Sequence, residues 1–523
     1  MRFRLISRLM LFSALTLSLQ AAVSLPTDNS AAMPAEVEGP AKTAMEAFQA
    51  GRHAKAVELA TPLAAQGNAE ALYLLGFAHE SGQGVEASKE KALEYYRKAA
   101  DGKHKDAVYR LSFILLASEK EDERDQARQA LETAAKDDPA VAARILGEAY
   151  LRGLLTPAPD PDKAVFWWKR AADAGDILSV LLVARFYEGQ FGFPELKDAK
   201  ESLANYAKAA GLGNAGAMAA LGSRLLSGDE KNRDEKKGRE WLKKAIAAKE
   251  YSAYLALGDY EENVKKDLKA ALAEYERGKD AGQIDCMLRT ADFYLEGKGV
   301  EKDTDRGMAL LTKAAEAGNP VANFRVAAQF LSKEKPEAAD MFNGYGRLLA
   351  AANGNLSEAQ NELGLLYLSG KLGVADTPAG VAWLTRAAQG GSAQAQNNLA
   401  TLYERGIGGV PRNMENAGQL YSLAANQGHG PATLALARLI YEGVGTKPDP
   451  VKAWALATLA SERGEKEADK LVTEIAVKLD EKQRAAAVKE LETIKSGKAP
   501  DKEAPKPETP KLVKPAKPAK PAN

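Results

Sequence analysis

With 523 residues, the chain exceeds the size of one ordinary core, so we expect either several domains or an array of repeats. The 45% hydrophobic and 27% charged residues suit a folded chain with a water-exposed surface, and the formal net charge is zero. Basic residues concentrate at both ends, which leaves a mildly acidic middle. An acidic body lacks the basic face that nucleic acid requires, so we expect no nucleic-acid partner.

The N-terminal stretch over residues 1–22 is typical of a secretory signal peptide. A basic start is followed by an apolar run over residues 9–19 and by small residues at Ala21 and Ala22. That run covers about 11 residues, whereas a membrane-spanning helix needs about 20. We expect cleavage after Ala21, Ala22 or Ser24 and export from a bacterial cell, to the periplasm or as a secreted protein. An amphipathic anchor that stays attached is the alternative.

A linker with three prolines over residues 23–40 precedes a pattern that recurs about every 36 residues between 41 and 465. Each unit contains a Leu-Gly-like pair, whose small second residue defines what we call the small column, and it closes at a Gly-like position. The small column holds Gly76, Ser112, Gly147, Ala184, Gly222, Gly258, Gly364 and Ala400. The closing positions are Gly67, Gly102, Asp137, Gly175, Gly213, Lys249, Gly282, Gly318, Gly354, Gly391, Gly428 and Gly464. Two landmarks that stay in phase predict stacked pairs of helices.

The second helix of each predicted pair carries bulky aromatic residues. They are Tyr95, Tyr96, Trp167, Trp168, Tyr206, Trp241, Trp383 and Tyr421. At regular helical spacing such residues favour a packed core. A carbohydrate-stacking or peptide-binding stripe is the alternative.

The loops inside the predicted pairs contain Gly-x-Gly or Gly-Gly, as in Gly82-x-Gly84-Val85, Gly297-x-Gly299-Val300, Gly408-Gly409-Val410 and Gly443-x-Gly445. Glycines in such turns supply positive φ angles, and the valines are expected to pack back on the helices. The following helices are expected to begin at capping residues Asp160, Thr377 and Asp449, each directly before a proline. The closing glycines are expected to take the left-handed conformation that ends a helix.

These combined patterns resemble the Sel1-like repeat, a longer relative of the tetratricopeptide repeat. The resemblance covers about residues 41–465 and implies an all-α fold, a right-handed superhelical α/α solenoid of about twelve helix-hairpin repeats. It also implies a non-enzymatic scaffold or adaptor of the bacterial envelope that binds other proteins along a concave helical surface.

In solenoids of this kind the first helices line the inner wall. The register two residues before the small column then predicts partner-binding residues at Arg110, Arg289, Arg325 and Asn398. Arginine suits the recognition of a carboxylate on such a surface. A solvated face without a ligand is the alternative for each of these residues.

Residues 466–496 break the period but keep apolar stripes, and Asp480 precedes Gln483 at capping-box spacing. We expect helices that cap the end of the solenoid, with a docking helix for another protein as the alternative. The Lys/Pro/Ala-rich tail over residues 497–523 is expected to be extended and disordered. The charge pattern leaves two roles open for it: solubilisation, or contact with cell-wall polymer, anionic lipid or an acidic partner.

The sequence offers no motif for catalysis. Cys286 is the only cysteine and occupies a position that other units fill with alanine or serine, which predicts a packing role. No two of the four histidines have metal-binding helical spacing, so we expect no metal, no cofactor and no enzyme activity. The rival interpretations are a secreted Sel1-like hydrolase or β-lactam-binding protein, whose repeated cysteines this chain lacks, and a cell-wall tether acting through the basic tail.

Overall fold

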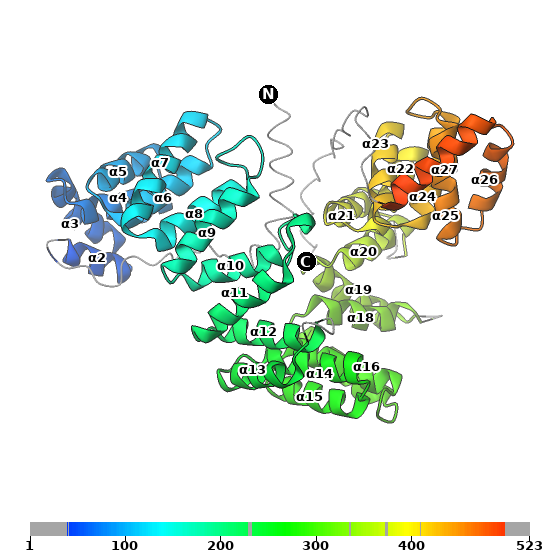
Figure 1. Cartoon of the computed structure of the whole chain (residues 1–523), viewed down its shortest axis with the longest axis horizontal. Helices are drawn as coiled ribbons and strands as arrows, with labels where there is room; N and C mark the ends of the chain where they lie inside the picture. Colours follow the sequence, from blue (N-terminus) through cyan, green and yellow to red (C-terminus); the bar gives the residue numbers. More distant parts are fainter. Residues whose placement is uncertain are drawn as a thin grey trace. The chain divides into compact units, whose positions relative to one another are not determined.

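The computed structural model describes residues 39, 41–228, 233–333, 336–371, 375–407 and 409–496. The predicted signal peptide over 1–22 and the tail over 497–523 lie outside the described residues, as does Gly408 of one predicted loop. The described part is α-helical apart from turns, one short 3-10 helix and one π-helical turn, and it holds no β-strand (Figure 1). The predicted all-α fold is therefore confirmed.

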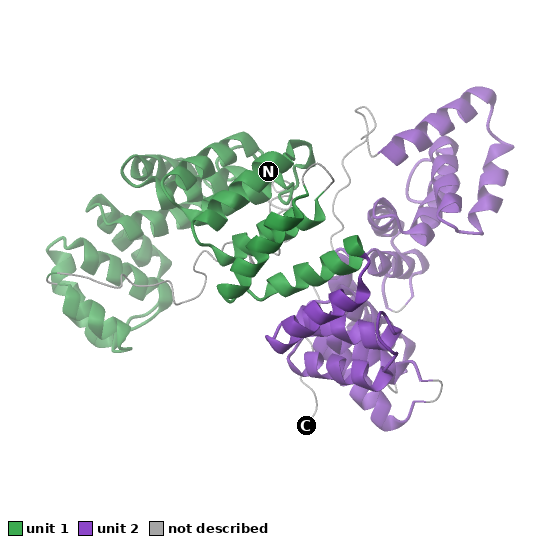
Figure 2. Cartoon of the chain, turned by 60° about the horizontal axis from the view of Figure 1, so that its bottom comes forward, with its two compact units in different colours: residues 1–265 green, residues 266–523 purple. Residues whose placement is uncertain are grey.

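The chain divides into two compact units, residues 1–265 and 266–523 (Figure 2). The α-helices of unit 1 are α2 (Lys42–Gln49), α3 (His53–Ala65), α4 (Ala69–Ser81), α5 (Lys89–Asp101), α6 (Lys105–Leu116), α7 (Glu121–Asp137), α8 (Pro139–Leu151), α9 (Pro161–Asp173), α10 (Ile177–Tyr187), α11 (Ala199–Gly211), α12 (Ala215–Ser227), α13 (Glu235–Ala247) and α14 (Ser252–Tyr260). This unit also contains the 3-10 helix Pro194–Leu196 and the π-helical turn Glu261–Lys265.

The α-helices of unit 2 are α15 (Leu268–Asp280), α16 (Ile284–Glu296), α17 (Thr304–Glu316), α18 (Pro320–Leu331), α19 (Ala338–Asn353), α20 (Ser357–Ser369), α21 (Thr377–Gln389), α22 (Ala393–Arg405), α23 (Met414–Asn426), α24 (Gly430–Glu442), α25 (Pro450–Glu462), α26 (Ala468–Ala476) and α27 (Glu481–Ser496). In both units successive helices form hairpins, such as α4 with α5 and α20 with α21, and each second helix also packs on the first helix of the next hairpin. This is the predicted stack of helix pairs.

The positions of the small column have no room for a large residue, because a bulky side chain of the second helix packs against them. A Cβ atom on Gly76 of α4 would lie 2.7 Å from Cδ1 of Tyr96 on α5. A Cβ on Gly147 of α8 would lie 2.5 Å from Nε1 of Trp168 and 2.8 Å from the carbonyl oxygen of Ala164. Real Cβ atoms do not approach other heavy atoms so closely, so a residue without a Cβ lets the two helices of a hairpin come together.

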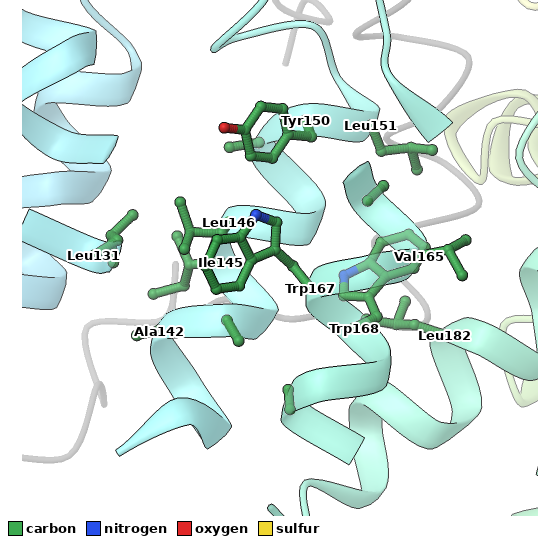
Figure 3. Packing of buried hydrophobic residues seen from close by; sticks show 14 of the residues in the cluster. Leu131, Ala142, Ile145, Leu146, Tyr150, Leu151, Val165, Trp167, Trp168 and Leu182 are labelled. Atoms are coloured by element: carbon green, nitrogen blue, oxygen red, sulfur yellow. The ribbon is translucent and has the colours of Figure 1, made fainter. Parts of the chain in front are cut away.

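The bulky partners of the small column form the core, as predicted. Tyr96, Trp168, Tyr206 and Tyr421 are buried. Figure 3 shows the cluster around Trp168, whose side chains come from α7, α8, α9 and α10. Other aromatic residues of the second helices are covered less completely. Trp383, for example, is half-buried, with the guanidinium carbon of Arg386 4.6 Å from its ring centroid.

The Gly-x-Gly loop performs two separate tasks. Gly82 ends α4 in the left-handed conformation with φ of 69°, which favours glycine. Gly84 lies so close to the preceding second helix that a Cβ would be 2.5 Å from the carbonyl carbon of His53. Val85 packs against the core between these helices, as predicted. The loop therefore joins one hairpin to the hairpin before it.

Two details of the predicted turns are wrong. The left-handed residues are Lys103 and Asn355, with φ of 62° in each case, rather than the predicted Gly102 and Gly354 that precede them. The cap of α21 is Asp376, whose carboxylate accepts the backbone N–H of Ala379 at 3.0 Å, so Thr377 already belongs to the helix. Asp is as good a cap as Thr, and the proline tolerates the second helical position as well as the first.

Helices α26 and α27 both pack on α25. Between them Asp480 and Gln483 form the reciprocal bonds of the predicted capping box. The backbone N–H of Asp480 donates to Gln483 Oε1 at 3.0 Å, and the backbone N–H of Gln483 donates to Asp480 Oδ1 at 2.8 Å. Both bonds satisfy backbone donors that a helix start leaves open.

Candidate partner-binding surface

Three of the four residues predicted to bind a partner hold successive first helices together. Arg110 on α6 donates from Nε and Nη2 to the two carboxylate oxygens of Glu80 on α4, each at 2.9 Å. Glu80 also accepts the hydroxyl proton of Tyr96 at 2.6 Å. Burial opposes the charge of Arg110, but the bonds to Glu80 outweigh this effect and the pKa of Arg110 rises. The guanidinium of Arg110 therefore joins the first helices α4 and α6 of two successive repeats.

Residues in the same register also join successive first helices in unit 2. Arg325 on α18 forms an ion pair with Asp292 on α16. Asn398 on α22 donates to Asn361 Oδ1 on α20 at 2.9 Å. Arg289 is exposed on α16. The structure thus places all four residues on first helices, and Arg110, Arg325 and Asn398 each bond to a residue of the preceding first helix. Their role in partner binding stays a prediction.

A second network of the Arg110 type was not predicted from the sequence. Glu188, directly after α10, accepts Arg224 Nε at 2.7 Å and Nη2 at 2.6 Å, and also the hydroxyl of Tyr206 at 3.0 Å. Burial raises the pKa of Tyr206 to about 12. The sequence does carry a signal, because Glu follows the small column in the pairs Glu80 with Tyr96 and Glu188 with Tyr206. The arginine, however, lies on different turns of α6 and α12, so a fixed register misses it.

A groove of about 520 Å³ lies between the first helices α10 and α12, over the second helix α11. Its walls include Leu178, Leu181 and Arg185 on α10 and Gly216 and Ala220 on α12. Leu178 is 42% exposed. Ala220 belongs to the register that was predicted to face a partner. We call this cavity the α10–α12 groove.

Small residues on α12 keep the α10–α12 groove open. A Cβ on Gly216 would have only Asn214 Oδ1 near it, at an ordinary contact distance of 3.5 Å. Ala217 and Ala220 add no more than a methyl group each to the same wall. The groove is therefore a consequence of residue size at these positions, and a larger residue at position 216 can fill it.

Arg185 supplies charge to the α10–α12 groove. It lies on the last turn of α10, and its side chain forms no hydrogen bond or ion pair with any residue that the structure describes. Its charge lowers the pKa of Tyr206, against the larger effect of burial. The nearest acid along the chain, Glu188, is already bonded to Arg224 and Tyr206. Arg185 therefore offers a guanidinium without a carboxylate.

A second groove, of about 880 Å³, lies among α18, α19 and α20 of unit 2. Apolar side chains line it, including Phe324, Leu331 and Leu366, and Glu362 of the predicted register borders it. Lys333 at its edge is paired with Asp340 at 2.6 Å. This groove is larger than the α10–α12 groove, and the charge of Lys333 at its edge is already compensated by Asp340.

Two of the four histidines act as helix caps. Nδ1 of His104 accepts the backbone N–H of Ala107 at 3.2 Å. Nδ1 of His429 accepts the backbone N–H of Ala432 at 3.2 Å, and burial lowers the pKa of His429. No group of three or more His, Cys, Asp or Glu side chains in the described ranges is arranged to hold a metal ion. Cys286 is fully buried, as its packing position predicts.

Across the residues that the structure describes, no helix has both the length and the apolar character needed to cross a membrane.

Stacked hairpins in which small and bulky residues recur at fixed positions define an α-helical repeat protein. The sequence model of the Sel1 repeat matches residues 69–104, 140–176, 180–214, 215–249, 284–319, 357–392, 393–429 and 430–465. The chain therefore belongs to the Sel1 repeat family, as the sequence patterns predicted. Proteins of this family generally mediate protein–protein interactions, and their fold is typically a non-enzymatic scaffold.

Solved structures of Sel1 type are similar to the chain. One is c5321, a protective antigen of uropathogenic Escherichia coli strains with an SLR fold, at 23% identity and a TM-score of 0.46 over 86% of this chain and 98% of that chain. Another is a Sel1 repeat protein from Oxalobacter formigenes, at 25% identity and a TM-score of 0.39 over 46% of this chain and 98% of that chain. The immunity protein Pa5087 from Pseudomonas aeruginosa matches at 23% identity and a TM-score of 0.28, over 44% of this chain and 82% of that chain. No curated protein matches the sequence.

Proposed function

We propose that the chain is a non-enzymatic scaffold of the bacterial envelope that binds a segment of another protein along its first helices. The α10–α12 groove is the observation that carries this proposal. It combines an exposed leucine, a wall of small residues and an arginine without an acidic partner among the described residues, and it lies between first helices. Apolar surface next to a charged group that lacks a partner is the composition of a protein-recognition surface.

Export is part of the same proposal. The basic start, short apolar run and small residues over 1–22 support cleavage and release outside the cytoplasm. Fractionation of cells that express the full-length chain tests it. Processed protein outside the cytoplasm is expected, and unprocessed protein in the cytoplasm would contradict export.

Site-specific photocrosslinking in cells tests the scaffold function. A photoreactive residue replaces Leu178 in the groove or, as the control, Leu423 on the second helix α23, which has a similar exposure of 45% against 42%. We expect one discrete protein adduct from position 178 and none from position 423. The crosslinked protein, once purified, must also bind the purified chain. Equal adducts from both positions, or none from either, would overturn the function.

A further inference from the structure

We propose that the α10–α12 groove takes an extended partner segment in which an apolar side chain lies between Leu178 and Gly216 and an Asp or Glu side chain pairs with Arg185. This inference rests on the proposed function, because it names the chemistry of the segment that the scaffold binds.

The apolar end of the groove lies at the first turns of the two helices. Leu178 and Leu181 of α10 stand on one wall, and Gly216 and Ala217 of α12 form the other. Gly216 adds no side chain to the facing wall, and Leu178 is 42% exposed. An apolar side chain of a partner can bury this leucine and fill the space beside Gly216.

The charged end lies at the last turn of α10. Glu188 cannot compensate Arg185, since its oxygens accept Arg224 Nε at 2.7 Å, Arg224 Nη2 at 2.6 Å, Tyr206 Oη at 3.0 Å and Gln190 Nε2 at 2.7 Å. These bonds use the acceptor sites of one carboxylate. A guanidinium left over beside such a network binds a further carboxylate in bidentate geometry.

Unit 2 contains an ion pair at the position that corresponds to Arg185, and within the described part of the chain the α10–α12 groove lacks this ion pair. Asp292 follows the small residue Ala291 of α16, as Arg185 follows the small residue Ala184 of α10. Asp292 forms an ion pair with Arg325 on the next first helix. The residue of α12 in the register of Arg325 is Ala220, which has no charge to offer. A partner carboxylate would therefore complete in trans a contact that unit 2 completes within the chain.

The spacing of the two ends sets the spacing in the partner. Leu178 and Arg185 are about two helical turns apart, which is about 10 Å at 1.5 Å per residue. An extended segment covers this distance in about three residues at 3.3 Å each. The proposed segment is thus an apolar residue followed about three positions later by Asp or Glu.

The experiment starts with random dodecapeptides displayed on phage and panned against the purified full chain. Peptides that bind the support in the absence of the chain are removed. We expect the remaining peptides to share an apolar residue followed about three positions later by Asp or Glu. Enrichment without an acid, or no enrichment at all, would overturn the inference. The crosslinking at Leu178 would still test the scaffold function separately.

A selected peptide is then synthesised with capped ends and measured by fluorescence anisotropy. Arg185→Glu should weaken binding by about tenfold or more, and exchanging the acid of the peptide for lysine should restore part of that loss. Arg438→Glu is the matched control, since Arg438 has the same place on α24 and lies in unit 2. Equal losses for both variants would overturn the assignment, as would a lack of rescue or binding that needs a free peptide carboxyl terminus.

The groove itself is tested by a pair of glycine variants. Gly216→Leu should abolish peptide binding, whereas Gly211→Leu on α11 should leave it unchanged, because a Cβ at 211 meets nothing within 4 Å and Gly211 does not line the groove. Circular dichroism of both variants controls for folding. If a correctly folded Gly216→Leu variant binds the peptide as the unmodified chain does, the peptide does not occupy the groove.

Discussion

Replacing Gly147 with alanine tests the close approach of helices within a hairpin. The new Cβ would lie 2.5 Å from Trp168 Nε1 and 2.8 Å from the backbone oxygen of Ala164. The indole is fully buried and the second neighbour is backbone, so neither can move easily. Overpacking of this kind costs about 2–3 kcal/mol. Alanine regains about 1 kcal/mol through its higher helix propensity. We therefore expect a net loss of about 1–2 kcal/mol.

Gly418→Ala in α23 is the matched control for Gly147→Ala. A Cβ on this helical glycine meets nothing within 4 Å, so the change should stabilise the protein by about 0.5–1 kcal/mol. Repeat proteins open in parts, so hydrogen exchange of the α8 and α9 amides is measured together with urea unfolding. Exchange in Gly147→Ala that is as slow as in the unmodified chain would refute the packing account.

Three further changes test single contacts by urea unfolding. Arg110→Ala should cost about 1–2 kcal/mol because it removes two hydrogen bonds from the half-buried Glu80, and a double variant Arg110→Met with Glu80→Gln should recover part of this loss. The pKa of His429 lies below its ordinary value of 6.5, so its contribution is complete above about pH 6.5 and is lost as the pH falls toward the folded pKa. His429→Asn should remove that loss, and an equal pH dependence in both proteins would contradict the capping role. Asp376→Ala should cost about 1 kcal/mol and Thr377→Ala much less, whereas the reverse order would place the cap at 377.

The hairpin packing could be predicted from the sequence because it depends on residue size. A small residue at Gly147 and a bulky one at Trp168 recur in phase, and such a pattern has few physical explanations other than contact. The buried place of Cys286 followed from the same comparison. The family was recognised for the same reason, since its landmarks are packing positions.

The polar contacts were harder to predict because side-chain length makes their positions flexible. Arg110 and Arg224 reach equivalent glutamates from different turns of their helices. The left-handed residue at Lys103 was also missed. Glycine favours this conformation, so the prediction placed it at the neighbouring Gly102. The α10–α12 groove could not be predicted from the sequence. Its only sequence signal is the run of small residues on α12, and small residues at such positions normally indicate close helix packing.

The most direct test of the account compares the affinity of the partner captured from position 178 for three proteins, by isothermal titration calorimetry. The unmodified chain and Gly211→Leu should bind it equally, and Gly216→Leu should show no measurable binding. Equal binding by all three would contradict the claim that the α10–α12 groove is the partner site.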